Sequence, residues 1–598
     1  MILIIVALVT FGNTLMNSFI WDDVIFLRDD PYIKISNPLF FLKPDYWIKY
    51  FRGTPGRYRP LRSILFSIEY RLWGLNPMFY HLRNIVLHTI VVVLIFLFLK
   101  KWVFFDNERL AFLTSLVFAV HPVHVESVAW IKNCTDIFCL IFFILSFHFF
   151  LKSQESMSQS RKLRDCGYRD DGDGDTQAKA CDYHNNTAES QSEACGYHDN
   201  VVGVPFRVRK KVVLSVVYYI LAIVFYILSV LAKEMGVTLP VVILAYLWIV
   251  RKEKNLVKNL IKLSGYIVLL IAVFIYKVFV LEPEAPLTVE ISYIIKTFGE
   301  YVQILLFPFN LCAERNLGKV MSFFEPTFLL GIFSLIVITL IFVYIKNLRF
   351  PLAFFMITIL PVLNIIYLVG RPLAEQRMYI PSLGFCMVLG YIFDRMWEEK
   401  LTQKIFVLLV ALYAIVAIDR NFDWRDPITF WEKTLYQTGS PRAFLNLGEA
   451  YLSIGDNELG IRVSKQALRY DPSFVGALAN IGIGYMKLGE KEKALECFYK
   501  SLMMQPYDAN NYVNFAVALL EQGHLEEAKK ILEKGLQLDD KNALLHYTLG
   551  NVYAQLKHFD KAAEHFKTAM FLNPDLKIAE RNYKQALLDM QHMQQKSN

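Results

Sequence analysis

Long apolar runs, separated by short polar connections, dominate residues 1–419 of this chain. The runs cover residues 1–17, 84–100, 109–121, 136–151, 212–230, 236–250, 263–281, 327–345, 350–369, 379–396 and 403–419. Because a helix needs about 20 apolar residues to cross a bilayer, this pattern predicts an all-α, polytopic membrane domain of about eleven spans, a few of them short. The first run lacks the basic start and the small-residue cleavage site of a signal peptide, so we expect it to remain as the first span.

Positive charges mark alternate connections between these runs. They are Lys100 with Lys101, Arg161 with Lys162 and residues 207–211, residues 251–254, Lys346 with Arg349, and Arg395 with Lys400 and Lys404. Cytoplasmic loops are enriched in Lys and Arg, so these connections are expected in the cytoplasm, with the N-terminus inside and the C-terminus outside. Residues 282–326 must then return to the side that they left, and we expect a re-entrant or amphipathic stretch at 291–310.

Four polar stretches fall on the outer face in this topology. They are residues 18–83, 121–127, 232–236 and 371–379, and the first includes Asp22 and Asp23 directly after the first apolar run. Acids and bases at a membrane boundary are costly and usually mark a function. We therefore expect the four stretches to form one shared site.

Residues 153–206 have a different composition from the rest of residues 1–419. They are polar and rich in Asp, Ser, Gln and Gly, which predicts a disordered cytoplasmic insert. The eight cysteines of the chain form no CxxC pair, so neither a disulfide framework nor a zinc site is predicted. The formal net charge of +8 can be assigned to the membrane-flanking clusters, and it gives no reason to expect nucleic acid as a partner.

A period of 34 residues begins near residue 440, where the sequence changes to that of a soluble helical domain. Small residues recur at this interval at Gly448, Gly482, Ala516 and Gly550, at Gly455, Gly489 and Gly523, and at Ala494, Ala528 and Ala562. Period and residue types match about four tetratricopeptide repeats, whose paired helices stack into an α-solenoid. We expect this domain at 440–598, on the outer side, after a linker with the first post-membrane helix at 420–439.

Five sequence blocks of the membrane half occur in a fixed order. They are "WDD" after the first run, "RYRPLRSILFSIEYRLWGLNPMFYHLRNIVLH" (57–88), "HPVHVESVAWI" (121–131), "LAKEMGVTLP" (231–240) and "AEQRMYIPSLGF" (374–385). Followed by the repeats, these blocks resemble the transmembrane and tetratricopeptide-repeat-containing O-mannosyltransferases and their bacterial relatives. The resemblance covers nearly the whole chain apart from the insert.

The resemblance implies a membrane glycosyltransferase of the C-type (GT-C) fold. Such enzymes take a sugar, here mannose or another hexose, from a polyprenyl phosphate on the outer face. In the O-mannosyltransferase group the acceptor is a Ser or Thr hydroxyl of an exported protein, and the repeats are expected to bind that protein. The displacement inverts the anomeric carbon, so one base is needed on the face opposite the leaving phosphate.

The acids and cations of the blocks supply candidates for each role. For the base we expect Asp22 or Asp23, of which one acts because adjacent side chains point apart on an extended segment, with Glu126 as a second acid. The candidates for binding the donor phosphate are Arg377, Arg371, Lys233 and Arg59, and the further pocket residues are His121, His124, Glu234, Glu375 and Tyr379.

Three points stay open at the level of sequence. His121 and His124 do not have the spacing of a helical metal site, so no metal ligands are predicted, while dependence on a divalent cation is undecided. Lys233 with Glu234 is an internal ion pair in an alternative interpretation. In "KNCTD", Cys134 stands where many bacterial relatives carry an Arg, and Lys132 could supply that charge.

Two other functions compete with protein glycosylation. In one, the same fold glycosylates a lipid-linked or surface glycan. In the other, the chain is a non-catalytic, membrane-anchored repeat scaffold, which would need no acids gathered on one face. The short N-terminus and the lack of a retrieval signal favour a bacterial inner membrane with periplasmic repeats over an endoplasmic reticulum membrane with luminal repeats.

Overall fold

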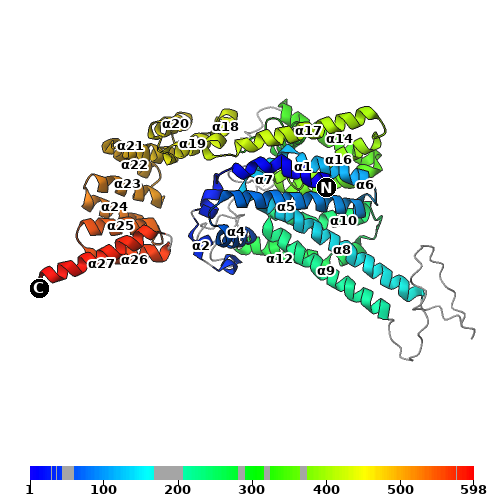
Figure 1. Ribbon diagram of the computed structural model, residues 1–598, viewed down its shortest axis with the longest axis horizontal. Coiled ribbons are helices and arrows are strands. Elements are labelled where there is room, and N and C mark those ends of the chain that lie inside the picture. Colours follow the sequence, from blue (N-terminus) through cyan, green and yellow to red (C-terminus); the bar gives the residue numbers. More distant parts are fainter. Residues whose placement is uncertain are drawn as a thin grey trace, which may run out of the picture.

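The computed structural model describes residues 1–28, 30–35, 37–42, 59–166, 206–280, 290–315, 324–363, 373–573 and 576–597. Figure 1 shows a bundle of long helices followed by an array of short helix pairs. The helices up to the array are α1 (Ile2–Phe11), α2 (Pro31–Ile35), α4 (Pro60–Trp73), α5 (Pro77–Phe98), α6 (Glu108–Val120), α7 (Val125–Ala129), α8 (Cys134–Cys166), α9 (Phe206–Ala232), α10 (Leu239–Ile249), α11 (Leu256–Lys262), α12 (Ser264–Val280), α13 (Ile291–Leu306), α14 (Pro326–Tyr344), α15 (Arg349–Ile359), α16 (Ser382–Arg395), α17 (Lys400–Asp423) and α18 (Pro427–Thr438).

The predicted apolar runs are helical wherever the structure describes them, but fewer than eleven of them qualify as complete spans. Among the described residues, five helical segments are long and apolar enough to cross a membrane, and bent helix pairs raise the number to as many as seven. The bends are 53° between α6 and the segment Pro122–Ala129, and 70° between α11 and α12. The first run and the segment Glu234–Ile249 are shorter apolar helices. The chain is therefore a membrane protein, and the count of eleven spans stays a prediction.

The connections after α5 and α16, which carry predicted cytoplasmic cations, lie together at one end of the bundle, which we call the inner end. Arg109 forms ion pairs with Asp394 (2.6 Å) and Glu398 (3.1 Å), which joins the start of α6 to the end of α16. Lys100 pairs with Glu108 at 3.3 Å. The loops after α5 and α16 thus lie together, as expected for connections on one side of a membrane.

The opposite end, which we call the outer end, is closed by contacts between the first and last apolar helices. Asn421 Nδ2 donates to the carbonyl of Thr10 at 2.9 Å, and the backbone N–H of Ser18 donates to the carbonyl of Arg425 at 2.8 Å. In Figure 1, α2, α4 and the helix pairs of the array lie toward this end, whereas α8 and α9 extend away from it. The acidic pair and the repeats are therefore at the same end.

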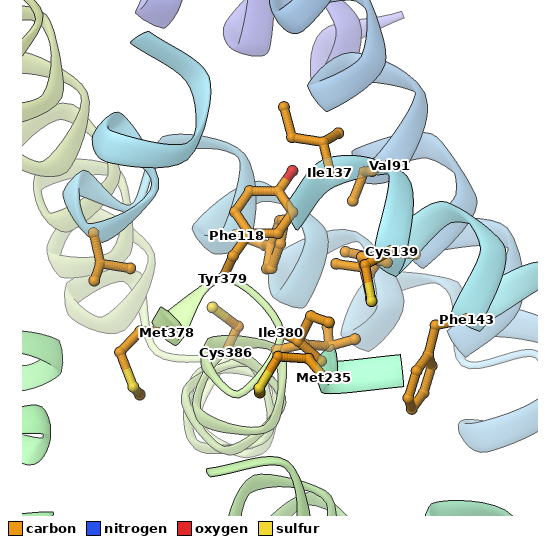
Figure 2. Packing of buried hydrophobic residues seen from close by; sticks show 14 of the residues in the cluster. Val91, Phe118, Ile137, Cys139, Phe143, Met235, Met378, Tyr379, Ile380 and Cys386 are labelled. Carbon is orange, nitrogen blue, oxygen red and sulfur yellow. The ribbon is translucent and has the colours of Figure 1, made fainter. Parts of the chain in front are cut away.

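The core of the bundle lies where α5, α6, α8 and the segment 374–387 meet. Val91, Phe118, Ile137 and Tyr379 are each fully buried there, and Figure 2 shows them converging from three helices and the loop before α16. Tyr379 is tied into this core by its hydroxyl, which lies 2.7 Å from Nδ1 of His88. The packing fixes the position of the loop before α16, which carries several of the predicted site residues.

Short helices pair in sequence from residue 441 onward. The pairs are α19 (Pro441–Ser453) with α20 (Asn457–Tyr470), α21 (Val475–Lys487) with α22 (Lys491–Met504), α23 (Ala509–Glu521) with α24 (Leu525–Leu538), and α25 (Ala543–Gln555) with α26 (Phe559–Leu572), followed by α27 (Lys577–Ser597). Gly455, Gly489 and Gly523 turn the chain between paired helices with φ of +90°, +80° and +82°. Lys557 takes the equivalent place in the fourth pair with φ of +63°. The 34-residue period therefore corresponds to one helix pair per repeat.

The first repeat packs directly onto the membrane part. Phe430 and Trp431 of α18 and Ala443 and Leu447 of α19 belong to the same buried cluster as the core of the bundle. Arg442 pairs with Glu314 at 3.3 Å, and Gln437 Nε2 donates to the carbonyl of Leu311 at 2.9 Å. The region 420–439 thus holds the array against the outer end.

The structure differs from the predicted insert at its start. Residues 153–166 continue α8 as a helix, and Ser156 Oγ donates to the carbonyl of Lys211 on α9 at 3.0 Å. Good helix formers such as Lys, Gln, Glu and Arg in this stretch, together with contacts to α9, outweigh its polar composition. The remainder of the predicted insert, 167–205, lies outside the described residues.

Candidate functional site

The acidic pair, Asp22 and Asp23, follows a tryptophan with an unusual backbone. Trp21 has φ of +52°, a left-handed conformation that costs energy for a residue with a large side chain. Its ring stacks on that of Trp130 at a centroid distance of 4.8 Å and an interplanar angle of 9°. The stack fixes the turn that presents the two acids to the segment 130–133.

Asp23 is fully buried and binds backbone. Its carboxylate accepts hydrogen bonds from the backbone N–H of Lys132 at 2.8 Å and from that of Ile20 at 3.4 Å. Burial raises the pKa of Asp23 to about 7, although the two backbone N–H groups oppose the shift. Asp23 therefore ties the first polar segment to the start of α8.

Asp22 is accessible and forms an ion pair with the ammonium group of Lys132. The Asp22 side chain is 23% exposed and that of Lys132 15%, so both groups reach the surface of the site. The charges of Arg59 and Arg62 also act on Lys132. Of the two predicted bases, Asp22 is thus the one that a bound molecule can contact.

The predicted phosphate ligands Lys233 and Arg59 both pair with acids, in an arrangement that the sequence did not predict. The ammonium group of Lys233 pairs with the carboxylate of Asp136, and both side chains are buried. Arg59 pairs with Glu234 at 3.1 Å, and the Arg59 side chain is 15% exposed. The internal pair thus joins Lys233 to Asp136 rather than to Glu234, while Arg59 stays open to a ligand.

Glu126 lies in α7, six residues before Lys132 in the chain, and is buried. Its Oε2 accepts a hydrogen bond from the backbone N–H of Gln376 at 3.0 Å, and its carbonyl accepts one from Asn133 Nδ2 at 3.1 Å. Through these bonds the block at 374–385 and the block at 121–131 are joined. Asp22 and Asp23 contact Lys132, the residue that directly follows the block at 121–131.

A second buried group of charges surrounds Glu375. The carboxylate of Glu375 accepts from the backbone N–H of Cys312 and lies 3.6 Å from the guanidinium of Arg420 at the end of α17. Burial raises the pKa of Glu375, and nearby Glu126 adds to the shift while Arg420 opposes it. Arg377 hydrogen-bonds the side chain of Tyr301. These contacts connect the loop before α16 to α13 and α17.

His121, His124 and Tyr379 lie in the core rather than at the surface of the site. His124 bonds the carbonyl of Phe118 and Oγ of Ser382, both at 2.8 Å, and His121 bonds the carbonyl of Leu305 at 3.2 Å. Over the ranges that the structure describes, no three His, Cys, Asp or Glu side chains come together in a way that could hold a metal ion. The two histidines therefore anchor the block at 121–131 in the protein.

The structure brings most of the predicted residues into one connected region at the outer end. Asp22, Asp23, Arg59 and Glu234 gather near Lys132, while Glu126 of α7 accepts a hydrogen bond from the loop before α16, which carries Glu375 and Arg377. Arg371 lies outside the described residues. Sequence reasoning missed Asp136 and Arg420 as partners, although Asp136 begins the apolar run 136–151 and Arg420 directly follows the run 403–419, and charges at such positions are the signal that would have found them.

The charged groups of the site can assist a reaction in which one group loses a proton and another gains negative charge. Asp22 is an accessible carboxylate that can accept a proton, and Lys132 and Arg59 beside it can stabilise an anion. Both groups lie at the end of apolar helices, where a molecule held in the membrane can reach them.

Comparison with known proteins confirms the resemblance of the membrane half and the repeats. The tetratricopeptide repeat family model matches residues 441–474, 475–508 and 519–588. The mouse protein O-mannosyl-transferase TMTC3 is 23% identical over 532 residues, covering 80% of this chain and 51% of that protein. The Caenorhabditis elegans protein O-mannosyl-transferase F38B6.6 is 24% identical, covering 79% of this chain and 63% of that protein.

Shorter matches and solved structures complete the comparison. Mouse protein O-mannosyl-transferase TMTC1 is 35% identical over 153 residues, which is 25% of this chain and 16% of that protein. A Thermus thermophilus tetratricopeptide repeat protein, TTC0263, aligns with a TM-score of 0.26 and 21% identity, over 30% of this chain and 95% of that one. The chain spans about half the length of the mouse and human TMTC3 proteins that it matches. It is a relative of proteins named protein O-mannosyl-transferases.

Proposed function

We propose that this chain, a relative of proteins named protein O-mannosyl-transferases, is a membrane glycosyltransferase that moves mannose or another hexose from a polyprenyl phosphate to Ser or Thr hydroxyls of exported proteins. The fold is of the C-type glycosyltransferase class in this proposal, and the reaction inverts the anomeric carbon. One observation carries it: an accessible carboxylate, Asp22, pairs with Lys132 at the outer end of the apolar helices, where the charge of Arg59 also acts on Lys132.

The acceptor hydroxyl attacks the anomeric carbon while Asp22 takes its proton. The new carbon–oxygen bond forms as the bond from that carbon to the phosphate oxygen breaks, and the leaving polyprenyl phosphate keeps the electron pair. Negative charge at Asp22 also stabilises the oxocarbenium-like sugar. Asp23 holds the segment in place through its bonds to backbone, so Asp22 is the catalytic residue of the pair.

Charge on the leaving phosphate requires nearby cations. Arg59 supplies one. Lys132 pairs with the base Asp22, on the face opposite the leaving phosphate, so in this proposal it positions that carboxylate. Arg377, bonded to Tyr301, and Arg371 are further candidates for the same phosphate. Lys233 is buried against Asp136, so in this proposal it stabilises the structure of the site and does not bind the phosphate.

The location of the donor explains why the site is at the membrane boundary. A polyprenyl tail stays in the bilayer, so the chemistry must take place at its surface. The repeat array lies at the same end of the bundle and packs on it through α18 and α19, which supports a role of its surface in binding a protein acceptor. This surface faces away from the cytoplasm in the proposed topology.

Substitution of Asp22 tests the proposal. We expect Asp22→Asn to lower transfer of hexose from a polyprenyl-phosphate donor to exported proteins by about 10²–10⁴-fold, because the variant lacks the general base. Mass spectrometry of exported proteins from host cells that carry the wild type, the variant or no copy of the chain measures the loss of hexose on Ser and Thr.

The matched control is Asp419→Asn, which removes an exposed carboxylate near the end of α17 and should leave transfer unchanged. Equal activity of Asp22→Asn and the wild type would contradict the assignment of the base. An unchanged protein profile together with an altered surface glycan, on removal of the chain, would contradict a protein acceptor.

A further inference from the structure

A cavity opens at the inner end of the bundle, opposite the acidic pair. Its volume is about 670 Å³, and it lies between the last two turns of α5, the stretch 144–155 of α8 and Arg251 after α10. Leu97, Leu145 and Phe149 are among its apolar side chains, and Lys100, Lys101 and Arg251 are its cations. A volume of this size is within the range of sites for small organic molecules.

Two of the cations are held at the rim by aromatic rings. The ammonium group of Lys101 lies 4.6 Å from the centre of the Trp102 ring, and the guanidinium of Arg251 lies 5.8 Å from the same ring. Trp102 is itself fixed, because its indole N–H donates to Nδ1 of His148 at 3.0 Å and its carbonyl accepts from the hydroxyl of Tyr246 at 2.7 Å. The rim is therefore preorganised without a ligand.

The charge balance of the cavity favours an anion. Asp106 and Glu155 also line it, so three cations face two carboxylates. Lys100 is paired with Glu108 outside the lining, at 3.3 Å. Within the described part of the chain, neither Lys101 nor Arg251 forms an ion pair with a carboxylate, so both can bind an external one or a phosphate.

Apolar walls behind a cationic rim match one class of molecule. A soluble anion would leave Leu97, Leu145 and Phe149 in contact with water, whereas a phospholipid covers them with its acyl chains. Trp102 follows α5 at the end of the segment Pro77–Val103, which is long and apolar enough to cross a membrane, so the cavity lies at the end of a candidate span. In the predicted topology the inner end contacts the cytoplasmic leaflet, which is rich in anionic lipids.

We propose that this cavity binds an anionic phospholipid of the cytoplasmic leaflet. Its phosphate lies between Lys101 and Arg251, and the start of its acyl chains lies along Leu97, Leu145 and Phe149. The site is separate from the proposed transferase site, and binding at it requires no catalytic activity.

The test uses the full chain in detergent micelles with dioleoylphosphatidylglycerol and dioleoylphosphatidylcholine at equal concentrations, and native mass spectrometry counts the retained lipid. We expect the wild type to retain one phosphatidylglycerol in preference to phosphatidylcholine. The double variant Lys101→Gln/Arg251→Gln should bind it about 30-fold more weakly, because each cation near a lipid surface contributes about 1 kcal/mol.

Two further variants make the result specific. Lys400→Gln/Lys404→Gln removes two exposed cations from the start of α17 at the same inner end, outside the cavity lining, and should bind as the wild type does. Leu97→Trp keeps every charge but fills the apolar part, and should also lose the lipid. Equal retention of the two lipids by the wild type, equal losses in the two double variants, or normal binding by Leu97→Trp would each overturn the proposal.

Discussion

Asp22 and Asp23 are neighbours in sequence but differ in exposure and partners. Asp22 reaches the surface and pairs with the Lys132 side chain, while Asp23 is buried on the Lys132 backbone. The sequence predicts that only one of two adjacent acids faces a substrate. It does not predict which one, because their common partner is more than 100 residues away and is brought close by the packing of α8.

The burial of Asp23 predicts a pH dependence of stability. Its pKa is raised from 3.8 to about 7 on folding, so the folded protein binds this proton more tightly than the unfolded chain does. The contribution of the group is fully present below about pH 4 and is lost as the pH rises through 7. We therefore expect the thermal stability of the wild type to fall from pH 5 to pH 8 by more than that of Asp23→Asn, which has no proton to lose.

Intrinsic tryptophan fluorescence of the purified protein, melted at several pH values, measures this difference. The comparison is between the two pH profiles, so any titration that both proteins share cancels. Parallel profiles for the wild type and Asp23→Asn would contradict the burial of an ionisable Asp23.

Charged residues near the ends of apolar runs show the limit of sequence reasoning at this scale. Lys233 was predicted beside a donor phosphate, but it pairs with Asp136 on α8. A cation in an apolar environment needs an anion, and the sequence alone offers several. Only the packing of α8 against α9 selects Asp136.

At the scale of the elements, the hydrophobic pattern predicts where the helices lie better than it predicts how long they are. Each apolar run corresponds to helix where the structure describes it, because a backbone in lipid must satisfy its own hydrogen bonds. The apolar run at 109–121 ends before Pro122, and the chain bends there by 53° into the segment that carries Glu126. Such bends position polar groups, and hydropathy averages do not record them.

A close contact between α13 and α14 predicts an effect of a single methyl group. A Cβ at Gly299 of α13 would overlap the carbonyl oxygen of Thr327 on α14, and one at Gly331 of α14 would overlap the carbonyl oxygen of Ile295. We expect Gly299→Ala to separate the two helices and destabilise the protein by about 1–3 kcal/mol, measured as a lower melting temperature in detergent.

Gly12→Ala is the matched control for this prediction. A Cβ at Gly12 meets no atom within 4 Å, and its φ of −59° suits any residue. A melting temperature of Gly299→Ala equal to that of Gly12→Ala would show that α13 and α14 are not in close contact.

At the scale of the whole molecule, the membrane part and the repeats share one core. The buried cluster of the bundle continues through α18 into Ala443 and Leu447 of the first repeat, whereas Ala509, Leu532 and Phe566 belong to a separate cluster of the later repeats. The 34-residue period predicted the repeats, but nothing in that period marks the first one as part of the membrane core.

This division predicts two different outcomes of truncation. A chain that ends at Asp471 keeps α19 and α20, so we expect it to fold and to release sugar from the donor. Its glycosylation of exported proteins should fall by at least about tenfold, because the acceptor surface of the later repeats is lost. Thermal melting, donor turnover and mass spectrometry of exported proteins measure the three effects.

A chain that ends at Thr438 is the comparison. It lacks Ala443, Leu447 and the Arg442–Glu314 ion pair, so we expect a lower melting temperature than for the chain that ends at Asp471. Equal stability of the two chains would contradict a shared core. Normal glycosylation of proteins by either one would contradict a role of the repeats in acceptor binding.

The contacts that close the outer end join residues near the start of the chain to residues that are synthesised much later. Asn17 and Thr10 bond Asn421 across 404 and 411 residues of chain. At a synthesis rate of about 5 to 20 residues per second, α1 is synthesised about 20 to 80 s before its partner Asn421. The speed of translation therefore sets a lower limit on the time in which one copy of this protein can assemble.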